Sequence, residues 1–335
     1  MLDGKKTNGP GATLHRRQFI AGATAAGALL AAPRAHAARG IVVYSTTLPP
    51  IQAELTQAFT AKTGIPVQSL RLTTSPLAQR FLAEQESGQA LCDVITLGHN
   101  EFFQDIAARG LLAPIDDIPG VSGLQGEWRP HDLYTMIMFA PNSIAYNTNL
   151  VASGSEPAGW EDVLRPEFRG EIIFADPRAN ETILQIIATL HDTYGDDYLR
   201  ALSRQNMRYV PSIPQGIEQV MAGEAKLMVP CLAMNLIQYQ GTDAPIRLIP
   251  TPSPTSGTFF FSGVVSSAPN PDGARAWYEY VLSEEGQEIL CRGNGVSALG
   301  QIPDSLLPPT SFLTHDMREL AERAHFYYDL LDLSA

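Results

Sequence analysis

The chain has 335 residues and is acidic, with 23 Lys and Arg against 35 Asp and Glu and a formal net charge of −12. This balance argues against nucleic acid as a partner, because phosphate groups are bound by clustered Lys and Arg. It also argues against binding to anionic lipid. The length is more than one hydrophobic core usually organises, so we expect two lobes.

Residues 1–37 have the pattern of an export signal. A twin arginine, Arg16–Arg17, precedes the apolar stretch Phe19–Ala32, and Ala35–Ala37 is an A-x-A cleavage signal. The apolar stretch is too short to span a membrane, and the paired arginines favour the twin-arginine route. We expect cleavage before Ala38 and a soluble, periplasmic protein; the alternative is a basic tail in front of a first core helix.

Strands and helices alternate in the first third of the remaining chain. Short apolar runs, each long enough for one buried strand, precede segments with helical spacing. These segments end at a glycine or begin with a hydroxyl-bearing cap residue and a proline. The expected strands are Ile41–Tyr44, Val67–Leu72 and Asp93–Leu97, with helices after Pro49–Pro50, after Thr73–Pro76 and through Phe102–Ala107. This order predicts a parallel sheet with crossover helices.

A second α/β set follows a crossing segment. The apolar stretch Thr135–Asn147 turns polar at Asn142, which marks the first crossing between lobes, and a return crossing is expected near Gly257–Ser262. Between them, Ser212 and Gln215 have capping-box spacing. The other expected elements are the strands Ile172–Ala175, Lys226–Leu232 and Phe259–Val265, a helix with Ile183, Ile186, Ile187 and Leu190 on one face, and later helices at Ala274–Leu282, Glu284–Cys291 and around Met317–Ala324.

These patterns predict an α/β fold with two lobes and a cleft between them. Each lobe is expected to be a mainly parallel sheet flanked by helices. The expected boundaries are a signal peptide at 1–37, a first lobe at 38–141 and 262–335, and a second lobe at 142–261.

Three cysteines are an odd set in an exported protein, because at least one thiol must be free or pair with another chain. We expect Cys92, Cys231 and Cys291 to be buried and unreactive. A Cys92–Cys291 bridge is the alternative.

Several phrases resemble the type II periplasmic solute-binding proteins, and their order matches over nearly all of residues 40–300. They are Val42–Ser45, Phe59–Val67, Asp93–Ile95, Arg165–Gly170, Ala175–Arg178 and Ser283–Gln287. The chain is most similar to the ferric-ion, aminoethylphosphonate and polyamine branch. The resemblance implies the two-lobed periplasmic-binding-protein fold (type II), and a monomer that captures a small-molecule solute and delivers it to an ABC permease in the inner membrane.

The ferric members of that branch use a His, a Glu and a Tyr pair, and the resemblance places these positions near Leu48, Gly98 and Ala233–Met234. None of these side chains can ligate Fe(III), which prefers hard anionic oxygen donors. The Tyr327–Tyr328 pair lies in the expected terminal helix, where packing is the ordinary role. We therefore expect no metal and no cofactor.

Polar loops at the carboxyl ends of the expected strands open helices, and helix amino ends favour phosphate, phosphonate or carboxylate. The alternative is that these side chains are ordinary caps. Arg71 or Arg178 could add a positive charge, whereas Glu181 would suit an amine. The candidate ligand-binding residues are Ser45, Thr46, Thr74, Ser75, His99, Asn100, Tyr146, Asn180, Thr182, Gln215 and Asn235.

We therefore expect a carrier of a small anionic solute rather than an enzyme. The segment Gly293–Ala298 matches G-x-G-x-x-A, but a helix, not a strand, is expected before it, and a dinucleotide site needs the strand. A ferric-ion or polyamine carrier of the same fold, and a ligand-sensing partner of a receptor kinase, are the alternatives.

Overall fold

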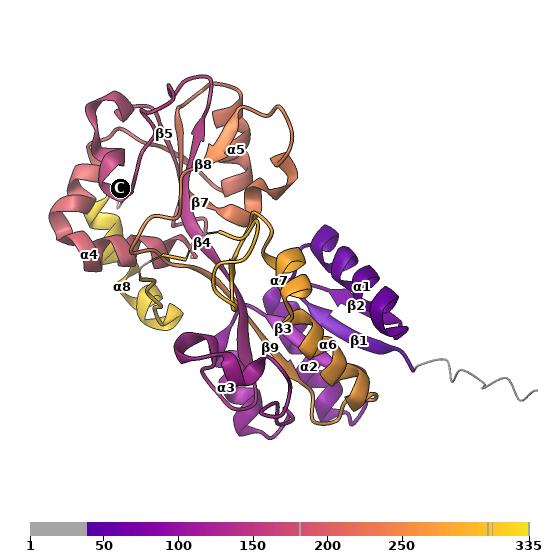
Figure 1. Cartoon of the computed structure of the whole chain (residues 1–335). Helices are drawn as coiled ribbons and strands as arrows, with labels where there is room; N and C mark the ends of the chain where they lie inside the picture. The colour runs from indigo at the N-terminus through magenta and orange to yellow at the C-terminus, as the bar shows by residue number, and fades with distance from the viewer. Residues whose placement is uncertain (1–38, 181, 307, 310, 334–335) are drawn as a thin grey trace, which may run out of the picture. The chain divides into compact units, whose positions relative to one another are not determined.

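One long strand is shared by two groups of strands, and this strand organises the molecule. The computed structural model describes residues 39–333 apart from 181, 307 and 310, so the expected export signal at 1–37 lies outside the described residues. The shared strand, β4 (Thr135–Asn147), pairs with β9 (Gly257–Val264) over its first half and with β7 (Leu227–Leu232) over its second half. Figure 1 shows β4 running from one group to the other.

The first lobe is a mixed sheet whose strands follow the order β2-β1-β3-β9-β4. Its first three strands are parallel, as the sequence predicts, and β9 joins them antiparallel to β3. The elements are β1 (Ile41–Ser45), α1 (Pro49–Thr63), β2 (Val67–Arg71), α2 (Thr74–Glu86), β3 (Val94–Leu97), α3 (Asn100–Ala108), α6 (Pro271–Val281), α7 (Glu284–Cys291) and β10 (Val296–Ser297).

The second lobe continues the strand order through β7, β5 and β6, which are parallel to one another. A short strand, β8, pairs with the end of β4. The elements are β5 (Ile172–Ala175), α4 (Ile183–Ser203), β6 (Arg208–Val210), α5 (Ile213–Met221), β7, the 3-10 helix η5 (Ala233–Tyr239), β8 (Ile246–Leu248) and the terminal helix α8 (Met317–Leu330).

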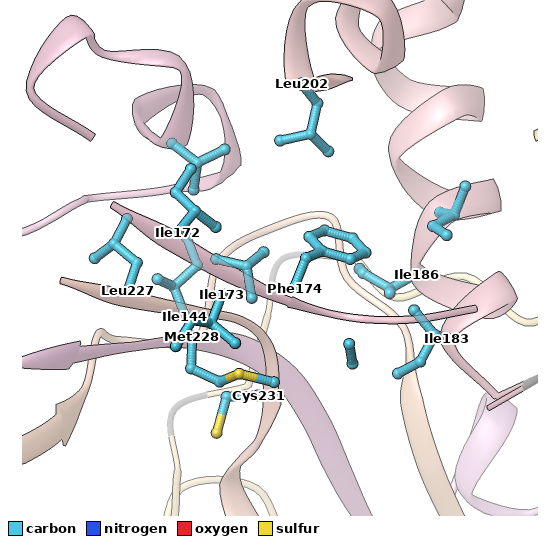
Figure 2. Packing of buried hydrophobic residues seen from close by; sticks show 14 of the residues in the cluster. Ile144, Ile172, Ile173, Phe174, Ile183, Ile186, Leu202, Leu227, Met228 and Cys231 are labelled. Atoms are coloured by element: carbon cyan, nitrogen blue, oxygen red, sulfur yellow. The ribbon is translucent and has the colours of Figure 1, made fainter. Parts of the chain in front are cut away.

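Separate hydrophobic clusters fill the two lobes. The cluster of the second lobe contains the buried faces of β5, β7 and α4, and Figure 2 shows Phe174 of β5 beside Ile183 and Ile186 of α4. Two further clusters cover opposite faces of the first sheet, one under α1 and α6 and the other under α2 and α3. The alternation of buried strands with one-sided helices that the sequence predicts is therefore confirmed.

The terminal helix α8 packs on the second lobe, where Leu320, Ala324 and Tyr327 join the same cluster as α4. This packing differs from the expected grouping of residues 262–335 with the first lobe. The reason is that the apolar face of α8 packs against α4, beside which it lies in Figure 1. Tyr327 is fully buried there, in the packing role expected of the Tyr327–Tyr328 pair.

All three cysteines are free and fully buried, as expected, so the alternative Cys92–Cys291 bridge is not formed. Burial raises the pKa of each thiol, which keeps the reactive thiolate scarce. Among the described residues, no helix is both long and apolar enough to cross a membrane.

Candidate functional site

A cavity of about 210 Å³ lies where helices of both lobes begin, beside the strands that connect the lobes. Helix starts, the two crossing strands and the terminal helix all contribute to its wall. The described residues that line it are Thr74, Gly98, His99, Asn142, Thr182, Ile183, Gln185, Leu232, Gly257, Thr258, Phe259 and Met317. None of them is Asp, Glu, Lys or Arg, so polar donors and apolar surface dominate the wall.

Two helices of the first lobe start at this cavity with extended N-cap residues. Thr73 precedes α2 and His99 precedes α3, and neither side chain caps the first turn of its helix. The first N–H groups of a helix have no partner within the helix. The first turns of α2 and α3 therefore leave backbone donors without a side-chain cap next to Thr74 and His99.

The start of α4 supplies the second lobe's part of the wall. Asn180 forms a local turn in which its side-chain oxygen accepts hydrogen bonds from the N–H of Thr182 (3.1 Å) and from the Thr182 hydroxyl (2.7 Å). The N–H of Ile183 donates to the Asn180 carbonyl. Asn180 therefore orders the turn before α4, whose N-cap residue Thr182 forms no side-chain cap, and both Thr182 and Gln185 line the cavity.

The crossing strands form the floor of the cavity and hold it by buried hydrogen bonds. Asn142 is 5% exposed, and its side-chain nitrogen donates to Ser256 (3.3 Å) while its carbonyl accepts from the Thr255 hydroxyl (2.9 Å). Gly257 pairs with Pro141 and leaves no room for a side chain, because a Cβ there would meet the carbonyl oxygen of Ala140. The two strands can therefore approach closely beneath the cavity.

A second cavity of about 310 Å³ adjoins the first and shares five of its lining residues, Gly98, His99, Gln185, Phe259 and Met317. Its wall is more strongly charged. Glu101, Glu127 and Asp316 are its carboxylates, and His315 adds a second imidazole beside His99.

Four of the sequence-predicted residues lie in these walls. Thr74, His99 and Thr182 line the first cavity, and His99 and Asn100 line the adjoining one. The Asn100 side-chain oxygen also accepts a hydrogen bond from the Tyr134 hydroxyl (2.9 Å), which fixes its orientation. The structure therefore brings together candidates from three of the predicted polar loops, those at Thr74, at His99–Asn100 and at Thr182.

The other seven candidates are not among the described lining residues of either cavity, and local contacts explain several of them. Ser45 is buried and accepts from the N–H of Thr47 (3.0 Å). Tyr146 packs on the core of the second lobe at the far end of β4, where it is paired with Arg247. The remaining residues outside both walls are Thr46, Ser75, Asn180, Gln215 and Asn235.

Two of the other expected helix starts, those of α1 and α5, cannot offer the same donors. Pro49 and Pro50 occupy the first two positions of α1, and proline has no N–H. At α5 the Ser212 hydroxyl accepts from the N–H of Gln215 (3.4 Å), so this cap, predicted from the capping-box spacing, occupies a donor. Sequence patterns at helix starts therefore overestimate the number of backbone N–H groups that are free to bind a solute.

Neither candidate arginine lies in a cavity wall. The guanidinium of Arg71 donates to the Thr47 carbonyl (3.1 Å). Arg178 pairs with Asp176 (2.8 Å) and donates to the carbonyl of Leu333 (3.0 Å), and this pairing holds the pKa of the Asp176 carboxyl below its usual range. Both arginines tie loops to neighbouring backbone.

Sequence reasoning missed Asn142, Gln185, Thr258, Phe259 and Met317. The change from apolar to polar residues at Asn142 was a usable signal, because a polar side chain within a buried strand needs a partner. Met317 and Gln185 meet across 132 residues, with the Gln185 amide donating to the Met317 sulfur at 3.0 Å. No local pattern in the sequence indicates that contact.

Among the described residues, no three His, Cys, Asp or Glu side chains are grouped so that they could hold a metal ion. The positions that the resemblance assigned to ferric ligands fit this result. Leu48 and Met234 are half-buried against the core of the first lobe, and Gly98 has no side chain. The side chains at Leu48, Gly98 and Met234 therefore supply no ligand for a ferric ion.

Two lobes joined by long crossing strands, with a small cavity at the helix starts between them, define the two-lobed solute-binding proteins of the type II periplasmic-binding fold. Members of this class bind a small solute and deliver it to an ABC permease. The chain belongs to the family of bacterial extracellular solute-binding proteins, whose model matches residues 41–295.

Known proteins with similar sequences or structures agree with this assignment. An uncharacterized protein of Haemophilus influenzae is 26% identical over 284 residues, which cover 81% of this chain and 80% of the relative. Iron-bound HitA from Pseudomonas aeruginosa has a TM-score of 0.65 at 19% identity, covering 87% of this chain and 99% of HitA. AfuA from Actinobacillus pleuropneumoniae, with exogenous fructose-6-phosphate bound, has a TM-score of 0.60 at 20% identity. The match covers 88% of this chain and 99% of AfuA. At these identities the structural likeness shows the fold.

Proposed function

We propose that this protein captures a small anionic solute, a phosphonate, a phosphate ester or a carboxylate, in the cavity at Thr74, His99 and Thr182. It works as a monomer in the periplasm, after export by the twin-arginine route, and delivers the solute to an ABC permease. One observation carries the proposal: α2 and α3 both begin at this cavity without side-chain caps.

The chemistry of the wall supports an anion. Uncapped amides at helix amino ends carry partial positive charge and suit phosphate or carboxylate. The hydroxyls of Thr74 and Thr258 add donors, and no carboxylate among the described lining residues would repel an anion. Closure of the lobes around the solute would exclude water and strengthen these contacts.

The size of the cavity supports a small solute. Its volume of about 210 Å³ lies below the range of about 300–1,000 Å³ that is typical of pockets for drug-sized ligands. The adjoining cavity extends the space past His99 toward carboxylates, so a solute with a short tail can still fit.

A polyamine is the second candidate. The carboxylates of Glu101, Glu127 and Asp316 in the adjoining cavity favour a cation. A ferric ion is supported by the iron-bound structure of HitA, although the donor set here would require a co-bound anion to supply oxygen ligands. A panel of solutes therefore includes phosphate, phosphonates, citrate, spermidine and ferric citrate, scored by the rise in melting temperature that tight binding causes.

The sharpest test of the anion site removes one backbone donor. Thr74 is the first residue of α2, and Thr73 before it is extended, so proline fits at position 74 without strain. Thr74→Pro removes both the N–H and the hydroxyl, whereas Thr74→Val removes only the hydroxyl. We expect Thr74→Pro to weaken binding of the anion found in the panel by about 10–100-fold, the value of one hydrogen bond to a charged group, and Thr74→Val to weaken it less.

Glu284→Pro is the matched control, because it makes the same change at the first residue of α7, after the extended Ser283, away from both cavities. Calorimetric titration measures the affinities, and melting without solute measures the fold. The proposal fails if Thr74→Pro and Glu284→Pro bind the anion as tightly as the unmodified protein, or if only a cation from the panel binds.

A further inference from the structure

The segment Ser311–Met317 passes from the first lobe to the second beside the solute cavity. It follows β10 in the chain and leads into α8, which packs on the second lobe. Four of its residues, Thr314, His315, Asp316 and Met317, line the adjoining cavity, and Met317 also lines the first one. The segment is therefore a third connection between the lobes, in addition to β4 and β9.

Its first half is attached to the crossing strands. Phe312 forms an isolated bridge with Thr255, and the N–H of Leu313 donates to the Thr255 carbonyl (2.9 Å). The Phe312 ring lies 5.0 Å from the ring of Phe139 and 5.5 Å from that of Phe259, which are themselves stacked at 4.7 Å. Backbone pairing and aromatic packing thus fix this end of the segment to the floor of the cavity.

Its second half is attached to α4. An imidazole nitrogen of His315 lies 3.1 Å from the Thr189 hydroxyl, and that hydroxyl also donates to the Gln185 carbonyl (2.8 Å). The Met317 sulfur accepts a hydrogen bond from the Gln185 side-chain amide (3.0 Å). Asp316 caps α8 by accepting from the N–H groups of Arg318 and Glu319, which sets where Met317 begins the helix.

We propose that Ser311–Met317 is a wall of the solute site and that Met317 is a specificity-determining residue, which limits the size of the solute and positions the Gln185 amide. The inference takes from the proposed function only that a solute occupies this cavity. Met317 is suited to this role because it lies in the wall of both the smaller and the larger cavity, where a change in the length of its side chain alters the space available in each.

Shortening Met317 should open the first cavity toward the adjoining one. Met317→Ala removes most of the side chain, whereas Met317→Leu keeps the bulk and removes only the sulfur acceptor of Gln185. The difference of one or a few side-chain carbons in a pocket changes discrimination by about 10–200-fold. Size discrimination and the positioning of Gln185 can therefore be measured separately.

The first experiment titrates the unmodified protein, Met317→Ala and Met317→Leu with inorganic phosphate and phenyl phosphate. We expect Met317→Ala to shift the ratio of the two dissociation constants about tenfold or more toward phenyl phosphate. Met317→Leu should keep the ratio and weaken both solutes about threefold to tenfold, as loss of one modest hydrogen bond would. Met221→Leu is the control, because Met221 packs on the same core but lies outside both cavities. An unchanged ratio in Met317→Ala overturns the inference.

The second experiment needs no assumption about the charge of the solute. The chain has 8 methionines, so methyl-labelled methionine gives few resonances, and Met317→Leu assigns that of Met317. Saturation with phosphate, phenyl phosphate, spermidine or ferric citrate, whichever raises the melting temperature, should move the Met317 resonance and leave that of Met221 unchanged. A bound solute that leaves Met317 unmoved overturns the inference. If the Met317 resonance moves with spermidine and with no other solute, the inference about Met317 is supported and the proposal that the solute is an anion is overturned.

Discussion

Gln287 illustrates how a single buried side chain can join three elements. Its side-chain nitrogen donates to the carbonyls of Ile137 (3.1 Å) and Val281 (2.9 Å). Its side-chain oxygen accepts from the Ser297 hydroxyl (2.8 Å) and the N–H of Ala298 (2.9 Å). The fully buried amide thus satisfies groups on β4, on the end of α6 and around β10. These bonds give a structural reason for the glutamine at the end of the segment Ser283–Gln287, which resembles the solute-binding proteins.

Replacing Gln287 by leucine should therefore be costly. The change keeps the volume nearly constant but leaves buried donors and acceptors without partners, at about 1–3 kcal/mol for each group that water cannot reach. We expect Gln287→Leu to lower the free energy of unfolding by about 3 kcal/mol or more. Urea denaturation measures it, with the exposed Gln57→Leu on α1 as control. A loss as small as that of the control would show that the network carries little stability.

The glycine of the same phrase has an equally local cause. A Cβ at Gly286 would meet the carbonyl oxygen of Tyr280, and the Ser283 hydroxyl accepts from the N–H of Gly286 (3.2 Å). The turn between α6 and α7 can therefore be tight only with glycine at 286 and a cap at 283. The capping role of Ser283 leaves a local sequence signature, because the hydrogen bond joins residues only three positions apart.

At the scale of elements, β9 brings the two lobes together because it contains glycine where it is closest to β4. A Cβ at Gly257 would meet the Ala140 carbonyl oxygen, which is fixed by strand pairing, and the Phe139 ring, which is stacked on Phe259. A Cβ at Gly263, on the same strand, would instead meet the end of the Leu112 side chain, which can move.

This difference predicts unequal costs for two alanine substitutions. Gly257→Ala should lower the free energy of unfolding by about 2–3 kcal/mol, since the strands must separate, and it should also weaken solute binding because Gly257 lines the cavity. Gly263→Ala should cost about 1 kcal/mol or less. Denaturation curves of both variants check this ordering, which equal losses would contradict.

The boundaries of most elements could be predicted from the sequence, because buried strands and amphipathic helices leave strong periodic patterns. The helix of Ile183, Ile186, Ile187 and Leu190 and the Ser212 cap are examples. The sequence analysis did not predict that β4 is one continuous strand that pairs in both sheets. The change from apolar to polar residues at Asn142 can equally mark the end of a strand. Its register, with an irregularity between Ser143 and Ala145, depends on partners distant in the sequence.

The candidate site was only partly predictable for the same physical reason. Thr74, His99, Asn100 and Thr182 come from helix starts, which have local signatures. The walls contributed by Gln185 and Met317 arise from packing between α4 and α8. Side chains such as Ser45 and Asn180, by contrast, have the polar character of binding residues but form bonds within their own loops.

At the scale of the whole molecule, His315 couples stability to pH. Burial lowers its pKa below the usual 6.5, with Arg323 acting in the same direction and Asp192 opposing them. The unfolded chain therefore binds more protons than the native one as the pH falls below about 6.5. The native state should lose stability from about pH 7 toward pH 5, and the loss should level off once native His315 is also protonated.

The substitution His315→Gln tests this coupling, because an amide can still bond to Thr189 but does not titrate. We expect the variant to show a flatter decline in melting temperature between pH 7 and pH 5 than the unmodified protein. His325→Gln, an exposed change on α8, should keep the original slope. Parallel curves for all three proteins would remove His315 as the cause.

The three connections between the lobes also bear on how such proteins can be recombined. Because β4 pairs with strands of both sheets, a junction placed within it has to preserve the pairing of both of its halves. β9 and the segment Ser311–Met317 would have to be cut as well. A chimera that grafts one lobe onto a relative's other lobe therefore requires three matched junctions. Exchange of solute preference is simpler through substitutions at the cavity wall than through a swap of lobes.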